Sequence, residues 1–105
     1  MSNRIGTFQK LDDNSFTGTV STLDLPNLTA TLVPVSVKTA REPDYRIYAN
    51  TENGRVAIGA GWLTEAKTSG QTYVNCRFSD PSITAFYARL VQFEGEEDYA
   101  LMISN

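Results

Sequence analysis

Tyrosines and arginines fall two or four positions apart in three strand-like segments, and the only tryptophan lies in a fourth. Residues separated by an even number of positions project from the same face of a strand, so each segment presents rings beside guanidinium groups. Sheet proteins that bind single-stranded nucleic acid stack bases on such rings and follow the phosphates with the cations. These residues form the candidate set: Trp62, Tyr73, Arg77, Arg46, Arg89, Tyr48 and Tyr87.

A purely structural role accounts for the same residues. Strands favour aromatic and β-branched side chains whatever the strand does. In this interpretation Trp62 belongs to the core, and the arginines lie on a solvated outer face among the tyrosines. Both interpretations stay open, because the sequence does not decide whether Trp62 is core or surface.

Several kinds of catalytic and metal chemistry lack their usual residues. The chain has no histidine, which removes histidine-dependent triads, the commonest general base and the usual transition-metal ligand. Gly59-Ala60-Gly61 lacks the third glycine of a dinucleotide-binding loop, and close packing of strands explains these glycines better. We therefore expect no enzyme, no cofactor and no metal site, although a carboxylate pair assembled by the fold stays open.

Acidic residues cluster in two predicted hairpin turns. Carboxylate oxygens could bind a hard cation such as Ca²⁺, but solvated acids are routine in turns, and we favour that explanation. Residues 1–89 have a charge of +1 and residues 90–105 have a charge of −4, so any nucleic-acid surface must be local. The clusters are Asp12-Asp13 and Glu94, Glu96, Glu97 and Asp98.

The single cysteine, Cys76, shares a predicted strand face with Val74 and Phe78, so we expect a small buried hydrophobe. One cysteine cannot form an intrachain disulfide, which fits a reducing compartment. The N-terminus lacks the apolar core of a secretory signal, and no apolar run approaches the roughly 18–20 residues of a membrane-spanning helix. We expect a cytoplasmic protein that has no membrane contact.

A long β-hairpin over residues 55–78 is expected to organise the chain. Its first strand divides into two faces, with Val56, Ile58, Ala60 and Trp62 on one and Ala57, Gly59, Gly61 and Leu63 on the other. A turn at residues 67–70 reverses the chain. The return strand then sets two faces against each other, Val74, Cys76 and Phe78 against Tyr73, Asn75 and Arg77.

Six further strand-like segments flank this hairpin, at residues 4–10, 15–22, 28–37, 44–49, 83–93 and 99–103. Asn53-Gly54 predicts a type I′ turn, which needs positive φ at both residues. Pro34 has no N–H group to donate, so we place its segment on an edge or at a bend. We predict one all-β domain over residues 1–105, a small antiparallel sandwich or partly open barrel of about eight strands with little or no helix.

Short motifs spread along nearly the whole chain resemble an uncharacterised bacterial family. They are Ile5-Gly6-Thr7-Phe8, Asp44-Tyr45-Arg46, Ile58-Gly59-Ala60-Gly61-Trp62, Gly70-Gln71-Thr72-Tyr73, Asp80-Pro81-Ser82 and Tyr87-Ala88-Arg89-Leu90. In this order they resemble domain-of-unknown-function family seven hundred and thirty-six, which is common on plasmids and conjugative elements. The resemblance implies a mobile-element context and no established activity. Members often carry lysines after the tryptophan, whereas this chain has Leu63-Thr64-Glu65, which counts against nucleic-acid binding by that part of the hairpin.

Two functions follow from these observations. The first is a binding module that engages single-stranded nucleic acid through the candidate set. The alternative is a self-associating or protein–protein interaction module, which pairs strands in a homodimer or uses its acidic last turn to inhibit a host DNA-binding protein.

Overall fold

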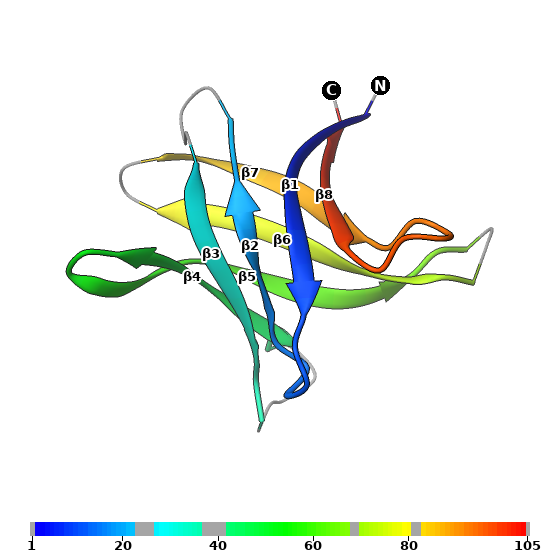
Figure 1. Ribbon diagram of the computed structural model, residues 1–105, viewed down its shortest axis with the longest axis horizontal. Helices are drawn as coiled ribbons and strands as arrows, with labels where there is room; N and C mark the ends of the chain where they lie inside the picture. The colour runs from blue at the N-terminus through cyan, green and yellow to red at the C-terminus, as the bar shows by residue number, and fades with distance from the viewer. Residues whose placement is uncertain (1, 23–26, 37–41, 68–69, 81–82, 105) are drawn as a thin grey trace.

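Eight antiparallel strands follow one another around a closed barrel (Figure 1). The structure is a computed structural model, and it describes the chain except residues 1, 23–26, 37–41, 68–69, 81–82 and 105. The strands are β1 (Ser2–Lys10), β2 (Phe16–Val20), β3 (Leu28–Pro34), β4 (Tyr45–Thr51), β5 (Gly54–Glu65), β6 (Thr72–Asp80), β7 (Ile83–Val91) and β8 (Tyr99–Ser104). The predicted all-β class is confirmed, and the described residues contain no helix.

Pairing between β1 and β8 closes the barrel. Of the two predicted architectures, the barrel is therefore the correct one. Figure 1 shows the two chain ends side by side, as this pairing requires. No described helix is long and apolar enough to cross a membrane.

The core fills the inside of the barrel with every second residue of the strands. Its largest fully buried side chains are Phe8, Phe78, Leu32, Ile47, Leu90, Leu101, Val20 and Cys76. The predicted inward face of the return strand, Val74, Cys76 and Phe78, is confirmed because all three are buried. Alternation between an apolar inside and a polar outside is what a half-exposed antiparallel sheet requires.

Contacts between aromatic rings of different strands strengthen the core. Phe16 makes edge-to-face contacts with Tyr45 and Tyr99, at centroid distances of 5.6 and 4.9 Å. Phe78 stacks on Phe86 at 4.9 Å. Such pairs contribute about 0.5–1.5 kcal/mol each beyond the area that they bury. The Phe16 contacts join β2 to β4 and β8, and the Phe78 contact joins β6 to β7, two strands that carry much of the candidate set.

The predicted alternation of β5 is wrong, because a register shift interrupts the strand. Ile47 lies opposite Gly59, while its neighbour Tyr48 lies opposite Ala57, so Ile58 is an extra residue on β5. Such a bulge moves all later side chains to the other face. Ile58 is consequently buried in the core, whereas Trp62, which the sequence places on the same side, lies outside.

The turn between β4 and β5 also differs from its prediction. Gly54 has a φ of 108°, but Asn53 is not among the residues with positive φ, so this is not a type I′ turn. The two turn residues are Glu52 and Asn53, and Gly54 already pairs with Thr51. The positive φ is thus needed at the first residue of β5, where glycine adopts it without strain.

Pro34 ends β3, which pairs on one side with β2 and on the other with β4. Of the two positions proposed for its segment, the edge is therefore wrong, and Pro34 lies at the strand end, just before a bend at Ser36. The strand β3 is also shorter than predicted. The predicted turn at residues 67–70 lies partly outside the described residues. Gly70, which is described, has a φ of 69°, and its N–H group donates a hydrogen bond to the Ala66 carbonyl (2.9 Å).

Candidate functional site

The candidate set lies on the outer surface of four consecutive strands, β4 to β7. Ile47, Cys76 and Ala88 are buried inside the barrel, so the residues on either side of them along the strands project outward. Trp62 lies opposite Asn75, which is an outward position of β6. We call this surface, which carries all seven predicted site residues, the outer face.

Two cross-strand rows organise the outer face. The first row runs in register from β4 to β7 through Arg46, Ala60, Arg77 and Tyr87. The second row runs from β5 to β8 through Trp62, Asn75, Arg89 and Met102. Neighbouring strands are about 4.8 Å apart, so Arg46 and Arg77 stand about 10 Å apart with only a small alanine between them.

A first hollow opens along the β4 side of these rows. It has a volume of about 280 Å³. Its residues with large side chains are Arg46, Trp62 and Arg77, and the remaining lining residues are Ala57, Gly59, Ala60 and Ser79. The hollow exists because glycine and small side chains lie between two arginines and an indole. Two cations and one aromatic ring therefore converge on it.

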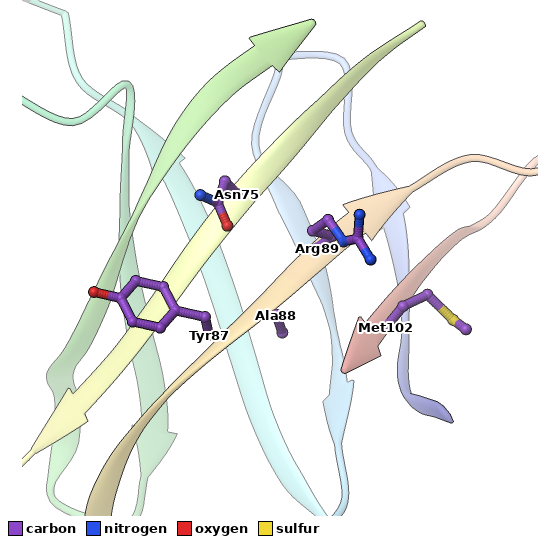
Figure 2. A pocket seen from close by; sticks show the side chains of 5 residues that line it. All are labelled: Asn75, Tyr87, Ala88, Arg89 and Met102. Carbon is purple, nitrogen blue, oxygen red and sulfur yellow. The ribbon is translucent and has the colours of Figure 1, made fainter. Parts of the chain in front are cut away.

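A second hollow of about 200 Å³ lies at the β8 side of the rows. It is lined by Asn75, Tyr87, Ala88, Arg89 and Met102. Figure 2 shows Tyr87 and Arg89 extending from β7 in different directions, with Asn75 near both in this view. Tyr87 is 62% exposed, the highest value among the exposed large hydrophobic residues of the described chain.

The second hollow forms where β8 leaves β7. Among the described residues, β8 pairs with β7 only through the segment Arg89–Val91, although β7 begins at Ile83. The earlier part of β7 therefore has no strand beside it on that side. Ala88, whose side chain is buried in the core, lines the hollow at this separation.

Close packing behind Trp62 fixes the course of β5. A Cβ atom on Gly61 would come within 2.7 Å of Val74 Cγ1, and one on Gly59 would collide with the Arg77 carbonyl oxygen. Only glycine lets β6 approach so closely at these two positions. The preference for close strand packing over a phosphate-binding loop is thereby supported.

Asp44 ties the loop before β4 to β5 on either side of Trp62. Its Oδ2 accepts a hydrogen bond from the Leu63 N–H group (2.8 Å), and its own N–H group donates to the Gly61 carbonyl (2.9 Å). A carboxylate that accepts a backbone N–H makes a charge-assisted bond, which is stronger than a neutral one. Asp44 therefore holds the backbone that carries the indole.

Tyr48 and Tyr73 lie at the margins of the outer face. Arg55 Cζ stands 5.9 Å from the centroid of the Tyr48 ring, a cation–π contact that covers this ring. Tyr73 lies opposite Thr64, beyond the Trp62–Asn75 pair. Neither tyrosine lines either hollow, so the fold brings five of the seven predicted residues around the hollows and leaves these two beside them.

The outer face is positive although the chain has a net charge of −3. Among the described acidic residues, Glu65 and Asp80 are the last residues of their strands, and the others lie in turns and loops. Arg46 and Arg77 form no ion pair with any described carboxylate. The acidic and basic residues are thus segregated, which gives a local positive surface.

Several ionisable residues outside the two hollows are buried or make local structural contacts. Cys76 is buried as predicted, and burial raises the pKa of its thiol to about 12, so it is an unreactive thiol at neutral pH. Hydrogen bonds from the Ser15 hydroxyl and N–H group lower the pKa of Asp13. Glu96 forms an ion pair with Arg4 at 3.6 Å. In the part of the chain that the structure describes, no three Cys, Asp or Glu side chains form a potential metal site.

Asn75 and Met102 were missed as site residues. The sequence predicts Asn75 on the same strand face as Tyr73 and Arg77. Asn75 was omitted because the candidate set contains only aromatic and cationic side chains. Met102 joins the site because β8 pairs with β7, and no local pattern reveals which distant strands pair.

Comparison with known proteins gives a single match. No curated protein and no solved structure matches this chain. One protein family matches residues 4–105, which is nearly the entire chain, and this agrees with the resemblance carried by the short motifs. The chain therefore belongs to the family described as Protein of unknown function (DUF736).

Proposed function

We propose that this protein is a non-enzymatic binding module that takes up single-stranded nucleic acid on its outer face. The observation that carries the proposal is the convergence of Trp62, Arg46 and Arg77 on the first hollow. An indole offers a stacking surface to a base, and two arginines that lack a described carboxylate partner offer charge to phosphates. The mobile-element context of the family is an expectation that fits such a ligand.

A single strand suits this face better than a duplex. Bases stacked in a duplex cannot reach aromatic rings on a sheet, whereas the bases of a single strand are free to do so. The chain also lacks a broad basic surface, since its net charge is −3. Stacking contributes about 1–3 kcal/mol per base and depends little on sequence. Two or three stacked bases would give useful affinity even with few phosphate contacts.

Fluorescence anisotropy tests this proposal. The probe is a labelled oligothymidine of about 12 nucleotides, with a duplex of the same length for comparison, at low and at physiological salt. Two arginines that meet phosphates predict a slope of about −1.4 for log K against log salt. We expect the single strand to bind more tightly than the duplex. No binding of the single strand at low salt would overturn the proposal.

Two charge variants sharpen this test. Arg77→Gln removes a cation from the first hollow and is expected to weaken binding and to reduce the salt slope by about 0.7. Lys10→Gln is the matched control, because it removes the same charge from an exposed residue at the end of β1. Equal effects of the two variants would mean that net charge, and not the outer face, controls binding.

Protein–protein interaction is the second candidate function. The part of β7 before Arg89 has no strand beside it on the β8 side, and Tyr87 within it is highly exposed. An unpaired strand can add a strand from another chain, so a homodimer through β7 is the form of this function that the structure favours. The acidic-inhibitor variant has less support, since Glu96 already pairs with Arg4. Sedimentation of the free protein at several concentrations distinguishes a dimer from a monomer.

A further inference from the structure

We propose that the second hollow accepts one guanine base of the bound strand, with Arg89 and Asn75 as the residues that read it. This inference rests on the function proposed above and adds a base preference to it. The relevant geometry is the second row, where Asn75 and Arg89 lie directly opposite each other on β6 and β7. Both side chains line the same hollow, so one ligand group can meet both.

The lining of the second hollow suits a flat ring with polar edges. Tyr87 is exposed and offers its ring for stacking, while Met102 provides an apolar contact. The polar side chains that line it, Arg89, Asn75 and Tyr87, together offer hydrogen-bond donors and acceptors. Arginine only donates, an asparagine amide donates and accepts, and the tyrosine hydroxyl does both.

The two purines differ where Arg89 would meet them. Guanine presents two acceptors, O6 and N7, which match the two parallel N–H groups of a guanidinium. Adenine places an amino group at the position of O6, so it would set a donor against a donor. Guanine N1–H also donates, and Asn75 Oδ1 accepts from such a group. The hollow is therefore complementary to guanine and mismatched to adenine.

The size of the expected preference for guanine over adenine follows from the energy of bidentate base contacts. A bidentate contact to a base discriminates against the wrong base by about 1–3 kcal/mol, which corresponds to roughly 5- to 150-fold in affinity. The two purines stack with similar surface, so stacking on Tyr87 should not separate them. We expect the lower part of this range, roughly tenfold, because the hollow is open to solvent.

Competition between oligonucleotides tests the inference with the full chain. Three labelled oligothymidines of equal length are compared: one unsubstituted, one with a single central guanine and one with a single central adenine. We expect guanine to raise affinity roughly tenfold over adenine. Arg89→Lys keeps the charge but loses the two-pronged donor, so it should abolish the preference and leave the salt slope unchanged. Arg4→Lys, which changes an exposed arginine of β1 outside both hollows, is the matched control and should keep the preference.

The outcomes separate this inference from the proposed function. If all three oligonucleotides bind equally, the function stands and the guanine site is overturned. A preference that survives Arg89→Lys also overturns it. If none of the three binds, both proposals fall.

A free guanine nucleotide could supply the same base. Guanosine monophosphate lacks the neighbouring nucleotides that meet the first hollow, so we expect it to compete only at concentrations far above those of the oligonucleotide. Competition at equal concentrations would assign the hollow to a free nucleotide and overturn the role in strand binding.

Discussion

Trp62 on β5 and Asn75 on β6 lie directly opposite each other on the outside of the barrel. The side chains of such a pair are about 4.5–5.5 Å apart at their Cβ atoms. Trp62 lines the first hollow and Asn75 lines the second, so this pair is the boundary between the two. Arg77 and Tyr87 face each other across the same boundary, so a ligand that fills both hollows passes over one of these two pairs.

Replacing Trp62 separates a ligand-binding role from a core role. Trp62→Ala should weaken oligothymidine binding by about 1–3 kcal/mol, because one stacking surface is lost. It should cost clearly less stability than the roughly 3–5 kcal/mol of removing a core tryptophan. Anisotropy and urea unfolding of the same variant measure both quantities. A large loss of stability would show that the indole supports the core.

Because Asp44 positions the backbone of Trp62, replacing it should change ligand binding in the direction opposite to the one that its charge predicts. Asp44→Ala removes an acid near a site for an anion, so charge alone predicts tighter binding. We expect weaker binding, by severalfold, because the Leu63 N–H group loses its acceptor and the backbone of Trp62 shifts. Asp44→Asn removes the charge but keeps an acceptor oxygen, and it should bind at least as tightly as the unmodified protein. Titration of the labelled strand against both variants measures the effect, and tighter binding by Asp44→Ala would contradict the positioning role.

Gly61 should not tolerate a side chain. A Cβ atom there would lie 2.7 Å from Val74 Cγ1, so Gly61→Ala should lower the free energy of unfolding by about 1–3 kcal/mol. Leu63→Ala, two residues further along the same strand, is the control. Leu63 is 51% exposed, and its truncation should change the free energy of unfolding by less than about 0.5 kcal/mol. Urea denaturation monitored by tryptophan fluorescence compares the two variants.

Burial of Cys76 predicts a loss of stability at alkaline pH. The folded protein keeps the thiol protonated up to a pKa of about 12, whereas the unfolded chain releases this proton near the ordinary value of 9.0. The unfolded state therefore binds fewer protons between these values, and the free energy of unfolding falls as pH rises through that range. Cys76→Ala should remove this part of the slope. Urea unfolding at several pH values measures it, and an unchanged slope in the variant would contradict the assignment.

Local alternation predicted the inward face of β6 correctly, since this strand keeps a regular two-residue period from Val74 to Phe78. It failed in β5, where the extra residue Ile58 reverses the period. No sequence rule marks this bulge, because Ile58 is apolar and fits either face. The type of the turn at Asn53-Gly54 was also predicted wrongly, because a glycine with positive φ occurs in more than one type of turn.

Residue type alone identified the candidate set, whereas the pairing of the strands determines which of its members lie together. Alternation within each strand placed Arg46, Arg77 and Arg89 on outward positions, but which strands are neighbours is a long-range property. The closure of the barrel through β1 and β8 joins segments at opposite ends of the chain. Asn75 shows that a search limited to rings and cations overlooks neutral groups that share their face.

The extra residue in β5 has a consequence for how this surface can change. Deleting Ile58 would leave Ala57 opposite Tyr48 and Gly59 opposite Ile47 in unbroken register, so the later residues of β5, Trp62 among them, would keep their present faces. A deletion within the regularly paired segment after Gly59 would instead turn the indole inward, toward a space where even a methyl group on Gly61 would collide with Val74. The bulge is thus a place where β5 can lose a residue without exchanging its interior and its surface.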